Sequence, residues 1–266
     1  MIKKFTKQQN MQCDEISASQ KRIYGDFDTH WHEYYEMEYI LEGSGEYIID
    51  GKKYDIEKGM LFFMSPINFH ELKNTDAEII NIMFSDELCN RNTLFSLFSE
   101  SNENAVCFKD NEAQFVELLL KDIVTAVSSG DKIYYESILN CLMIKTGNTA
   151  KSILSTRLTY IQSAMLYILN NFRSGITLSD TASHIGLTPA YLSSVFSREA
   201  GVTFKDYLNS IRFDYAKKLL IHSDINVSEV CYESGFDDYA NFIRNFKKFY
   251  GMPPGQYRKN NQTVKF

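Results

Sequence analysis

The chain has 266 residues, of which 44% are hydrophobic and 23% charged, and its formal net charge at pH 7 is −6. This length suits two domains, and the apolar content excludes a chain that is disordered throughout. The five cysteines are widely spaced and form no C-x-x-C pair, which argues against a disulfide framework and a thiolate zinc site. Because the chain has neither a membrane-length apolar run nor a signal-peptide core, we expect a cytoplasmic protein.

The charge is unevenly distributed along the chain. Residues 1–151 carry a net charge of −10, whereas residues 152–266 carry a net charge of +4. An acidic half joined to a basic half suggests that the two parts have different partners. A net charge of +4 is modest for a nucleic-acid-binding module, so such a role must be argued from the residue pattern.

Residues 28–84 have the pattern of a β domain. Apolar and polar residues nearly alternate over Tyr39–Asp50, Asp50-Gly51 is a hairpin turn signal, and the apolar run Leu61–Met64 ends just before Pro66. Many short strands with glycine turns favour a sandwich or a barrel. We assign residues 1–110 to this domain.

Histidines are concentrated in this β domain. His30 and His32 are two residues apart, so on a strand their side chains point to the same face. The segments G-x4-H-x-H-x3-E-x6-G from Gly25 and G-x6-P-x3-H-x3-N from Gly59 resemble the two motifs of the cupin family, although the second lacks its usual middle glycine. The resemblance implies that a metal-binding member would use His30, His32, Glu36 and His70.

Three imidazoles and a carboxylate allow more than one chemistry. They could hold Fe, Mn, Ni or Zn, and an open coordination position would permit catalysis. They could instead hydrogen-bond an organic ligand or one another. We favour a sensor that has no catalytic residue, metal or other cofactor and binds a small polar ligand such as a sugar. The candidate ligand-binding residues are His30, His32, Glu36 and His70, with Trp31 and Tyr39 as rings that could stack on the ligand.

From about residue 111 the apolar spacing becomes helical. One helical pattern runs to Ser128-Ser129-Gly130, and a second covers Ile133–Lys145. We assign residues 111–151 to a helical dimerisation and linker region. Five apolar residues of the second pattern could form a self-association face or could pack on the barrel: Tyr134, Tyr135, Ile138, Leu142 and Met143.

Residues 152–266 show only helical patterns and contain a repeat of about 50 residues. Gly186 matches Gly235 with an offset of 49, and Phe196 matches Phe246 with an offset of 50. Such a repeat indicates one supersecondary unit used twice. Each copy has a capping residue, a short helix, a glycine turn and a second helix, which is the helix-turn-helix plan.

The helix caps can be assigned from the same repeat. Thr177 and Asn226 each precede a first helix and have an acid three positions on, a capping-box arrangement. Thr188 and Pro189 start the second helix of the first copy, and Asp237 is expected to cap that of the second copy.

The second helix of each copy has a polar outer face that could contact DNA bases and phosphates. We expect Arg244 to contact guanine, Asn241 to read adenine, and Lys247 and Lys248 to contact phosphate. The full set of candidate DNA-binding residues is Ala190, Tyr191, Ser193, Ser194, Arg198, Tyr239, Ala240, Asn241, Arg244, Lys247 and Lys248.

These segments also resemble a known family. A-x-x-x-G-L-T-P-A-Y-L-S-S-V-F from Ala182, R-x-x-x-A-x-x-L-L from Arg212 and G-F-D-D-Y-A-N-F-I-R-N-F-K-K-F-Y-G-M-P-P-G-Q-Y-R from Gly235 are similar to the DNA-binding domain of the AraC family of regulators. The resemblance implies seven helices, a long helix over Thr203–Ile221 and a homodimer formed through the first domain. It also implies that six residues face the major groove: Ala190, Ser193, Ser194, Ala240, Asn241 and Arg244.

We therefore expect an α+β multidomain protein, with a cupin-like β-barrel followed by helices and then an all-α domain, residues 152–266, with two helix-turn-helix motifs. Its expected function is ligand-controlled transcription regulation. The expected partners are double-stranded DNA, a small-molecule effector such as a sugar and a second copy of the chain, with no membrane. Two other interpretations remain open: a metal-dependent cupin enzyme with a DNA-binding tail, and a constitutive DNA-binding protein whose barrel only dimerises.

Overall fold

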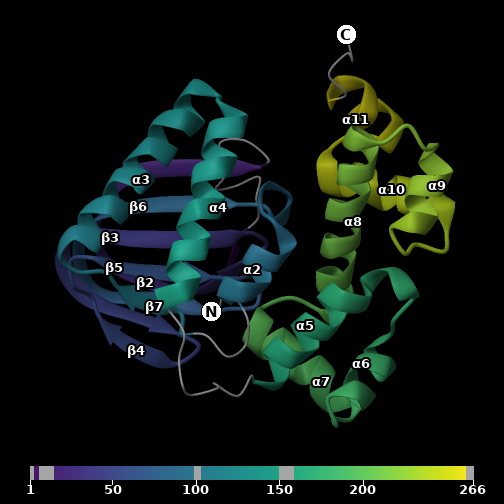
Figure 1. The fold of residues 1–266 in the computed structure, drawn as a ribbon. Helices are drawn as coiled ribbons and strands as arrows, with labels where there is room; N and C mark the ends of the chain where they lie inside the picture. The colour runs from purple at the N-terminus through teal and green to yellow at the C-terminus, as the bar shows by residue number, and fades with distance from the viewer. Residues whose placement is uncertain (1–2, 6–14, 99–102, 150–158, 262–266) are drawn as a thin grey trace. The chain divides into compact units, whose positions relative to one another are not determined.

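The computed structural model describes residues 3–5, 15–98, 103–149 and 159–261. The chain divides into two compact units, Met1–Leu158 and Thr159–Phe266 (Figure 1). The helices expected over residues 111–151 belong to the first unit together with the β strands. None of the helices in the described ranges is both long enough and apolar enough to cross a membrane.

Within its described residues, the first unit is built on one cupin-like sheet of seven strands, in which β2, β6, β3, β5 and β7 follow one another as antiparallel neighbours. β1 pairs with β2 in parallel, and β4 pairs with β3. Asp50 and Gly51 both have positive φ values in the turn between β3 and β4, which confirms the predicted hairpin. The strands are β1 Lys3–Phe5, β2 Ile16–His32, β3 Tyr35–Ile49, β4 Lys52–Asp55, β5 Met60–Met64, β6 His70–Phe84 and β7 Ala105–Cys107.

In the described residues of this unit, apolar side chains cluster on both faces of the sheet. Helices α3 Asp110–Ser129 and α4 Lys132–Thr149 cover one face, where they pack with η1 Asp86–Leu88 and α2 Arg91–Phe98 (Figure 1). A second cluster, which includes Ile40, Tyr47 and Phe62, fills the other face.

The structure decides between the two interpretations of the apolar face of α4. Tyr135, Ile138, Leu142 and Met143 are buried in the cluster between the helices and the sheet, so packing on the sheet is the correct interpretation for these four. Tyr134 differs from them, because its side chain is 47% exposed.

The second unit is entirely helical in the described residues. The long helix α8 lies between the two repeated units, and the resemblance had implied this helix over nearly the same residues. The elements are α5 Tyr160–Asn171, η2 Phe172–Ser174, α6 Leu178–His184, α7 Pro189–Val195, η3 Phe196–Ala200, α8 Phe204–His222, α9 Val227–Glu233, α10 Tyr239–Tyr250 and α11 Pro254–Asn261.

The caps explain why these short helices begin where they do. Thr177 and Asp180 form a reciprocal capping box at α6, and Asn226 and Glu229 form the same arrangement at α9. Such caps satisfy backbone N–H groups that the first turn of a helix leaves without acceptors. Both predicted boxes are therefore confirmed.

The cap of α10 differs from the prediction. Asp238, not Asp237, accepts the backbone N–H of Asn241. The physical reason is the residue inserted after Gly235, which lengthens the turn of the second copy by one position relative to the turn between Gly186 and Thr188.

Candidate functional site

The outer face of α7 carries the residues predicted from the first repeat. Leu192 and Val195 are buried in the unit and fix the rotation of the helix. Residues three or four positions apart lie on the same face of a helix, so the face opposite Leu192 and Val195 is exposed to solvent. The exposed predicted residues are Ala190, Tyr191, Ser193, Ser194 and, in the following π-helical turn η3, Arg198.

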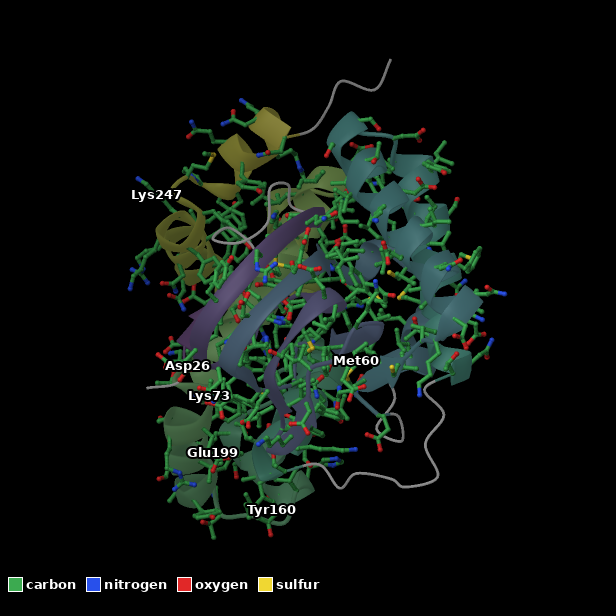
Figure 2. The ribbon with its side chains drawn as sticks, turned by 90° about the vertical axis from the view of Figure 1, so that its left-hand side faces the viewer. Asp26, Met60, Lys73, Tyr160, Glu199 and Lys247 are labelled. Carbon is green, nitrogen blue, oxygen red and sulfur yellow. The ribbon has the colours of Figure 1, made fainter. Side chains whose placement is uncertain are left out.

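The corresponding face of α10 is also open to solvent. Phe242 and Phe246 anchor the helix in an apolar cluster with Phe213 of α8. Asn241 is half-buried, and the other predicted residues are exposed: Tyr239, Ala240, Arg244, Lys247 and Lys248. Figure 2 shows Lys247 at the outer surface of this unit. Phe249 lies one turn beyond Phe246 and is 39% exposed.

Three polar side chains on α10 form a network that the sequence pattern did not reveal. Oδ1 of Asn241 accepts a hydrogen bond from Nδ2 of Asn245 at 2.6 Å and another from Nη2 of Arg244 at 3.3 Å. The backbone N–H of Asn241 donates to Oδ1 of Asp238 at 3.0 Å. Asn241 is thus held at both its backbone and its side chain.

The two outer faces are chemically unequal. With the offset of 50 residues, Tyr191 occupies the position of Asn241, and Ser194 occupies the position of Arg244. Arg198 of the first copy pairs with Glu199 at 2.7 Å, and this contact raises the pKa of its guanidinium. Among the described residues of the two helices, only the second copy therefore presents a guanidinium at the centre of its outer face, and that guanidinium is hydrogen-bonded to Asn241.

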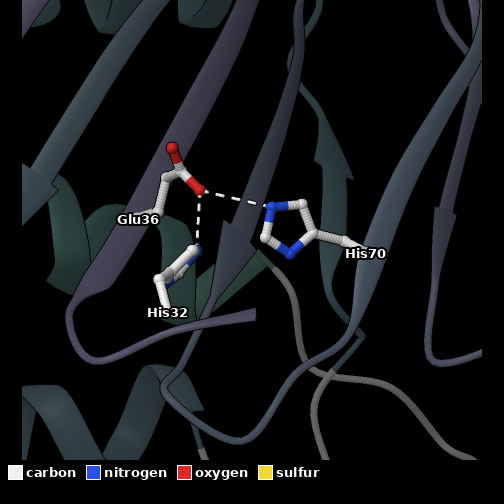
Figure 3. A group of neighbouring side chains, drawn as sticks. All are labelled: His32, Glu36 and His70. Atoms are coloured by element: carbon white, nitrogen blue, oxygen red, sulfur yellow. Dashed lines mark hydrogen bonds and ion pairs between the residues drawn. The ribbon is translucent and has the colours of Figure 1, made fainter. Parts of the chain in front are cut away.

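A buried polar cluster lies in the first unit, where His32, Glu36 and His70 come together from β2, β3 and β6 (Figure 3). Oε2 of Glu36 is 2.8 Å from Nε2 of His32 and 3.4 Å from Nε2 of His70. All three side chains are almost fully buried. His30 is half-buried beside them, with its ring centroid 4.0 Å from that of His70.

The hydrogen bonds of this cluster constrain its protons. Nδ1 of His32 faces the carbonyl oxygen of Tyr34 at 2.7 Å, while its Nε2 faces Glu36. Burial raises the pKa of Glu36, but the interactions of its carboxylate with His32 and His70 outweigh this effect and hold the pKa well below its usual value.

His70 is neutral in this environment. Burial lowers the pKa of His70 to about 3, so its ring carries one proton at neutral pH. Donation from Nε2 to Glu36 leaves Nδ1 as a buried acceptor, and Nδ1 has no hydrogen-bond partner among the described residues. Buried polar atoms are nearly always hydrogen-bonded, and a water molecule or a ligand hydroxyl group could supply a donor to this nitrogen.

The cluster also fits a small divalent cation. Two imidazole nitrogens and a carboxylate oxygen lie within 4.8 Å of one another, and zinc takes these ligand types. A metal-ligating histidine commonly donates its other N–H to a carbonyl, as Nδ1 of His32 can. His32, Glu36 and His70 would hold the ion, which would supply a positive charge in place of the proton between His32 and Glu36.

Sequence reasoning missed three neighbours of this cluster: Glu38, Tyr47 and Asn81. Nδ2 of Asn81 donates to Glu36 at 2.6 Å and to Glu38 at 2.7 Å, and the hydroxyl of Tyr47 donates to Glu38 at 2.7 Å. Burial, together with repulsion from Glu36, raises the pKa of Glu38 to about 7. The signal that could have found Glu38 is its even spacing from Glu36, which places both on one face of a strand.

Two predicted ligand-binding rings do not belong to the cluster. Tyr39 is fully buried on the helix-covered face, where its hydroxyl donates to the carbonyl oxygen of Ala113 in α3. Trp31 is also fully buried, and alternation along β2 points it away from the face of His30 and His32. Neither ring is available to stack on a ligand at the cluster, so this part of the prediction is corrected.

Comparison with known domain families identifies both parts of the chain. A helix-turn-helix domain family matches residues 181–260, and a cupin domain family matches residues 24–84. The first range begins within α6 and extends into α11, and the second contains His30, His32, Glu36 and His70.

Several curated proteins and solved structures are similar to the chain. The melibiose operon regulatory protein of Escherichia coli K12 is 26% identical over 88% of this chain and 84% of its own length. The uncharacterized HTH-type transcriptional regulator YfiF of Bacillus subtilis is 23% identical over 86% of this chain and 78% of its own length. The structure of ToxT from Vibrio cholerae O395 matches at a TM-score of 0.44 and 17% identity, covering 95% of this chain and all of that one.

Proposed function

Because this chain belongs to the AraC family of transcription regulators, we propose that its two helix-turn-helix units bind a specific DNA site under the control of a small polar ligand. The observation that carries the DNA part is the pair of short helices, α7 and α10, each anchored by buried residues and each presenting a polar face to solvent. Such faces suit base edges and phosphates in a major groove. The proposed contacts are the eleven residues predicted from the sequence.

The ligand part of the proposal rests on the buried cluster of the first unit. The unpartnered Nδ1 of His70 is an acceptor for a hydroxyl group, and the half-buried His30 connects the cluster with the surface. A sugar carries several hydroxyl donors, and a relative that spans most of the chain is named as the regulator of a melibiose operon. We therefore propose a sugar or similar polyol, held by His30, His32, Glu36 and His70 without a metal.

We further propose that the protein acts in the cytoplasm as a homodimer formed through the first unit. Exposed apolar side chains on α3 and α4 support this assembly, because large apolar groups on a helix pair are more stable when a partner covers them. They are Phe115, Leu118, Ile133, Tyr134 and Ile144. An analytical ultracentrifugation run that gave only monomer at micromolar concentration would contradict it.

The central experiment measures binding of the full chain to a fluorescent fragment of its own upstream DNA, at physiological salt and against a scrambled duplex. We expect preference for the natural fragment and a change in affinity when the correct sugar is added. The variant His70→Leu should keep the DNA preference and lose the response to the sugar. Equal binding of natural and scrambled duplexes, with every upstream fragment tested, would contradict the DNA part.

A second measurement separates the ligand-controlled regulator from the two other interpretations. A bound sugar raises stability by mass action, by about 2.7 kcal/mol at a hundred times its Kd. We expect a rise in Tm with one member of a sugar series and none in His70→Leu. A stoichiometric metal in the purified protein would instead favour the metal-binding cupin, and DNA binding that no ligand alters would favour the constitutive protein.

A further inference from the structure

The polar network on α10 bears on how the second helix-turn-helix unit selects a base. Arg244 and Asn245 both donate to the single side-chain oxygen of Asn241, at 3.3 and 2.6 Å. An amide oxygen has two lone pairs, so these two bonds use its whole capacity as an acceptor. The network therefore limits what Asn241 itself can read in a groove.

An asparagine recognises adenine through two hydrogen bonds, one donated to N7 and one accepted from the amino group at N6. The second bond needs Oδ1, which in this structure is occupied by Arg244 and Asn245. Asn241 retains only its Nδ2 donor. A lone donor does not distinguish adenine N7 from the acceptors of guanine or thymine.

Arg244, unlike Asn241, keeps most of its hydrogen-bonding groups available for a base. Its side chain is exposed at the middle of the outer face of α10, and only one of its five N–H donors is directed at Asn241. The remaining donors can meet O6 and N7 of guanine in the bidentate geometry that arginine uses most often. The bond to Asn241 restricts the rotamers of a long side chain before DNA binds, which reduces the entropy lost on binding.

We propose that Asn241 is a positioning residue which orients Arg244 toward a guanine and does not read adenine, and that Asn245 holds Asn241 in place. This inference rests on the proposed DNA-binding function. It assigns guanine specificity to the second helix-turn-helix unit alone, because the first unit has Tyr191 and Ser194 at the corresponding positions.

The test is selection of duplexes from a randomised library by the full-length chain, followed by affinity measurements on the selected site with each base pair substituted in turn. For the wild type we expect one guanine whose replacement lowers affinity about 5- to 150-fold. Arg244→Ala should abolish that preference. Asn241→Ala should weaken the preference at the same guanine by about twofold or more, since residues in one network are coupled.

Asn241→Asp separates the two roles of the amide. An aspartate keeps the acceptor oxygens for Arg244 and Asn245 but has no donor for adenine N7. We expect Asn241→Asp to retain the guanine preference that Asn241→Ala weakens, and Asn245→Ala to weaken it at the same base pair. Circular dichroism and Tm of each variant show that the helices remain folded.

Three outcomes would contradict different steps. If Asn241→Ala and Asn241→Asp both relaxed an adenine preference and left the guanine preference intact, the positioning role would be wrong. If Arg244→Ala left every base preference unchanged, the assignment of the guanine contact would fail while specific DNA binding stood. If the wild type enriched no sequence at all, the proposed DNA-binding function itself would fail.

Discussion

Nε2 of His32 lies 2.8 Å from Oε2 of Glu36, and both side chains are almost completely shielded from solvent. A buried ion pair adds little net stability, but removal of one partner leaves the other without compensation. Glu36 also accepts a hydrogen bond from Asn81 and faces His70. The carboxylate therefore joins three strands of the first unit.

The first prediction concerns this carboxylate. Glu36→Ala should lower the free energy of unfolding of the first unit by about 3–5 kcal/mol, because the donors of His32 and Asn81 lose their acceptor. Glu36→Gln should cost clearly less, since its amide can accept from Asn81 and donate to a neutral His32. Urea unfolding at pH 7 measures both values, and equal losses would show that the hydrogen bonds of the cluster contribute nothing to stability.

The second prediction concerns the pH dependence of stability. In the folded protein the pKa of Glu38 is about 7, above its ordinary value of 4.5, so the folded state binds this proton more tightly than the unfolded state does. Glu38 should then lower stability as the pH rises from about 4.5 to about 7, by up to roughly 3 kcal/mol.

The control for this titration is Glu38→Gln, which removes the ionisable group and keeps the shape of the side chain. The difference in unfolding free energy between Glu38→Gln and the wild type should grow in favour of the variant between pH 5 and pH 7. Glu36 affects stability at lower pH. Its pKa is lowered in the folded protein, so its contribution to the unfolding free energy is lost only as the pH falls below 4.5. A difference that stayed constant with pH would contradict the raised pKa of Glu38.

The third prediction compares two equivalent glycines. Gly186 and Gly235 both have positive φ values, 75° and 84°, so alanine is unfavourable at either by about 1–2 kcal/mol. A Cβ at Gly186 would meet open space, whereas one at Gly235 would lie 2.6 Å from the carbonyl oxygen of Phe172. Gly235→Ala should therefore lower Tm distinctly more than Gly186→Ala, and a reversed order in thermal unfolding would be inconsistent with the packing of η2 against this turn.

The fourth prediction concerns the lysine at the end of α10. Lys248→Ala should weaken binding to all duplexes alike and reduce the slope of log K against log salt concentration by about 1, as the loss of one phosphate contact does. Lys121→Ala removes the same charge from α3 and is the control, because that lysine pairs with Glu117 in the first unit. An unchanged salt slope in Lys248→Ala would remove this residue from the proposed phosphate contacts.

The helical unit could be predicted closely because its determinants are local. Capping boxes, glycine turns and apolar spacing each involve residues within a few positions, so Thr177 and Asn226 were identified from the sequence. The cap at Asp238 was missed by one residue. The second copy has one residue more than the first after Gly235, and the sequence alone does not show whether that extra residue precedes or follows the cap. The network of Asn241 depends on side-chain rotamers, which spacing alone does not specify.

The buried polar cluster of the first unit was predicted in part. The resemblance to the two cupin motifs implied His32, Glu36 and His70, which the structure brings together, and His30, which lies beside them. Tyr39 and Trp31 were chosen for nearness in sequence, although alternation along a strand turns each away from the cluster. Asn81 could not be found in advance, because its contact with Glu36 and Glu38 depends on the register between β3 and β6.

The length of α8 has a consequence for the DNA itself. Near its start, Tyr207 packs on Phe196 of the first helix-turn-helix unit, and near its end Leu220 lies in the core of the second. One continuous helix of 19 residues, roughly 28 Å long, thus fixes the separation of the two recognition helices. An extra base pair between their subsites would advance the second by about 3.4 Å and rotate it by about 34° around the duplex. If both recognition helices bind one duplex, as proposed, an operator with the right subsites and the wrong spacing should bind much more weakly.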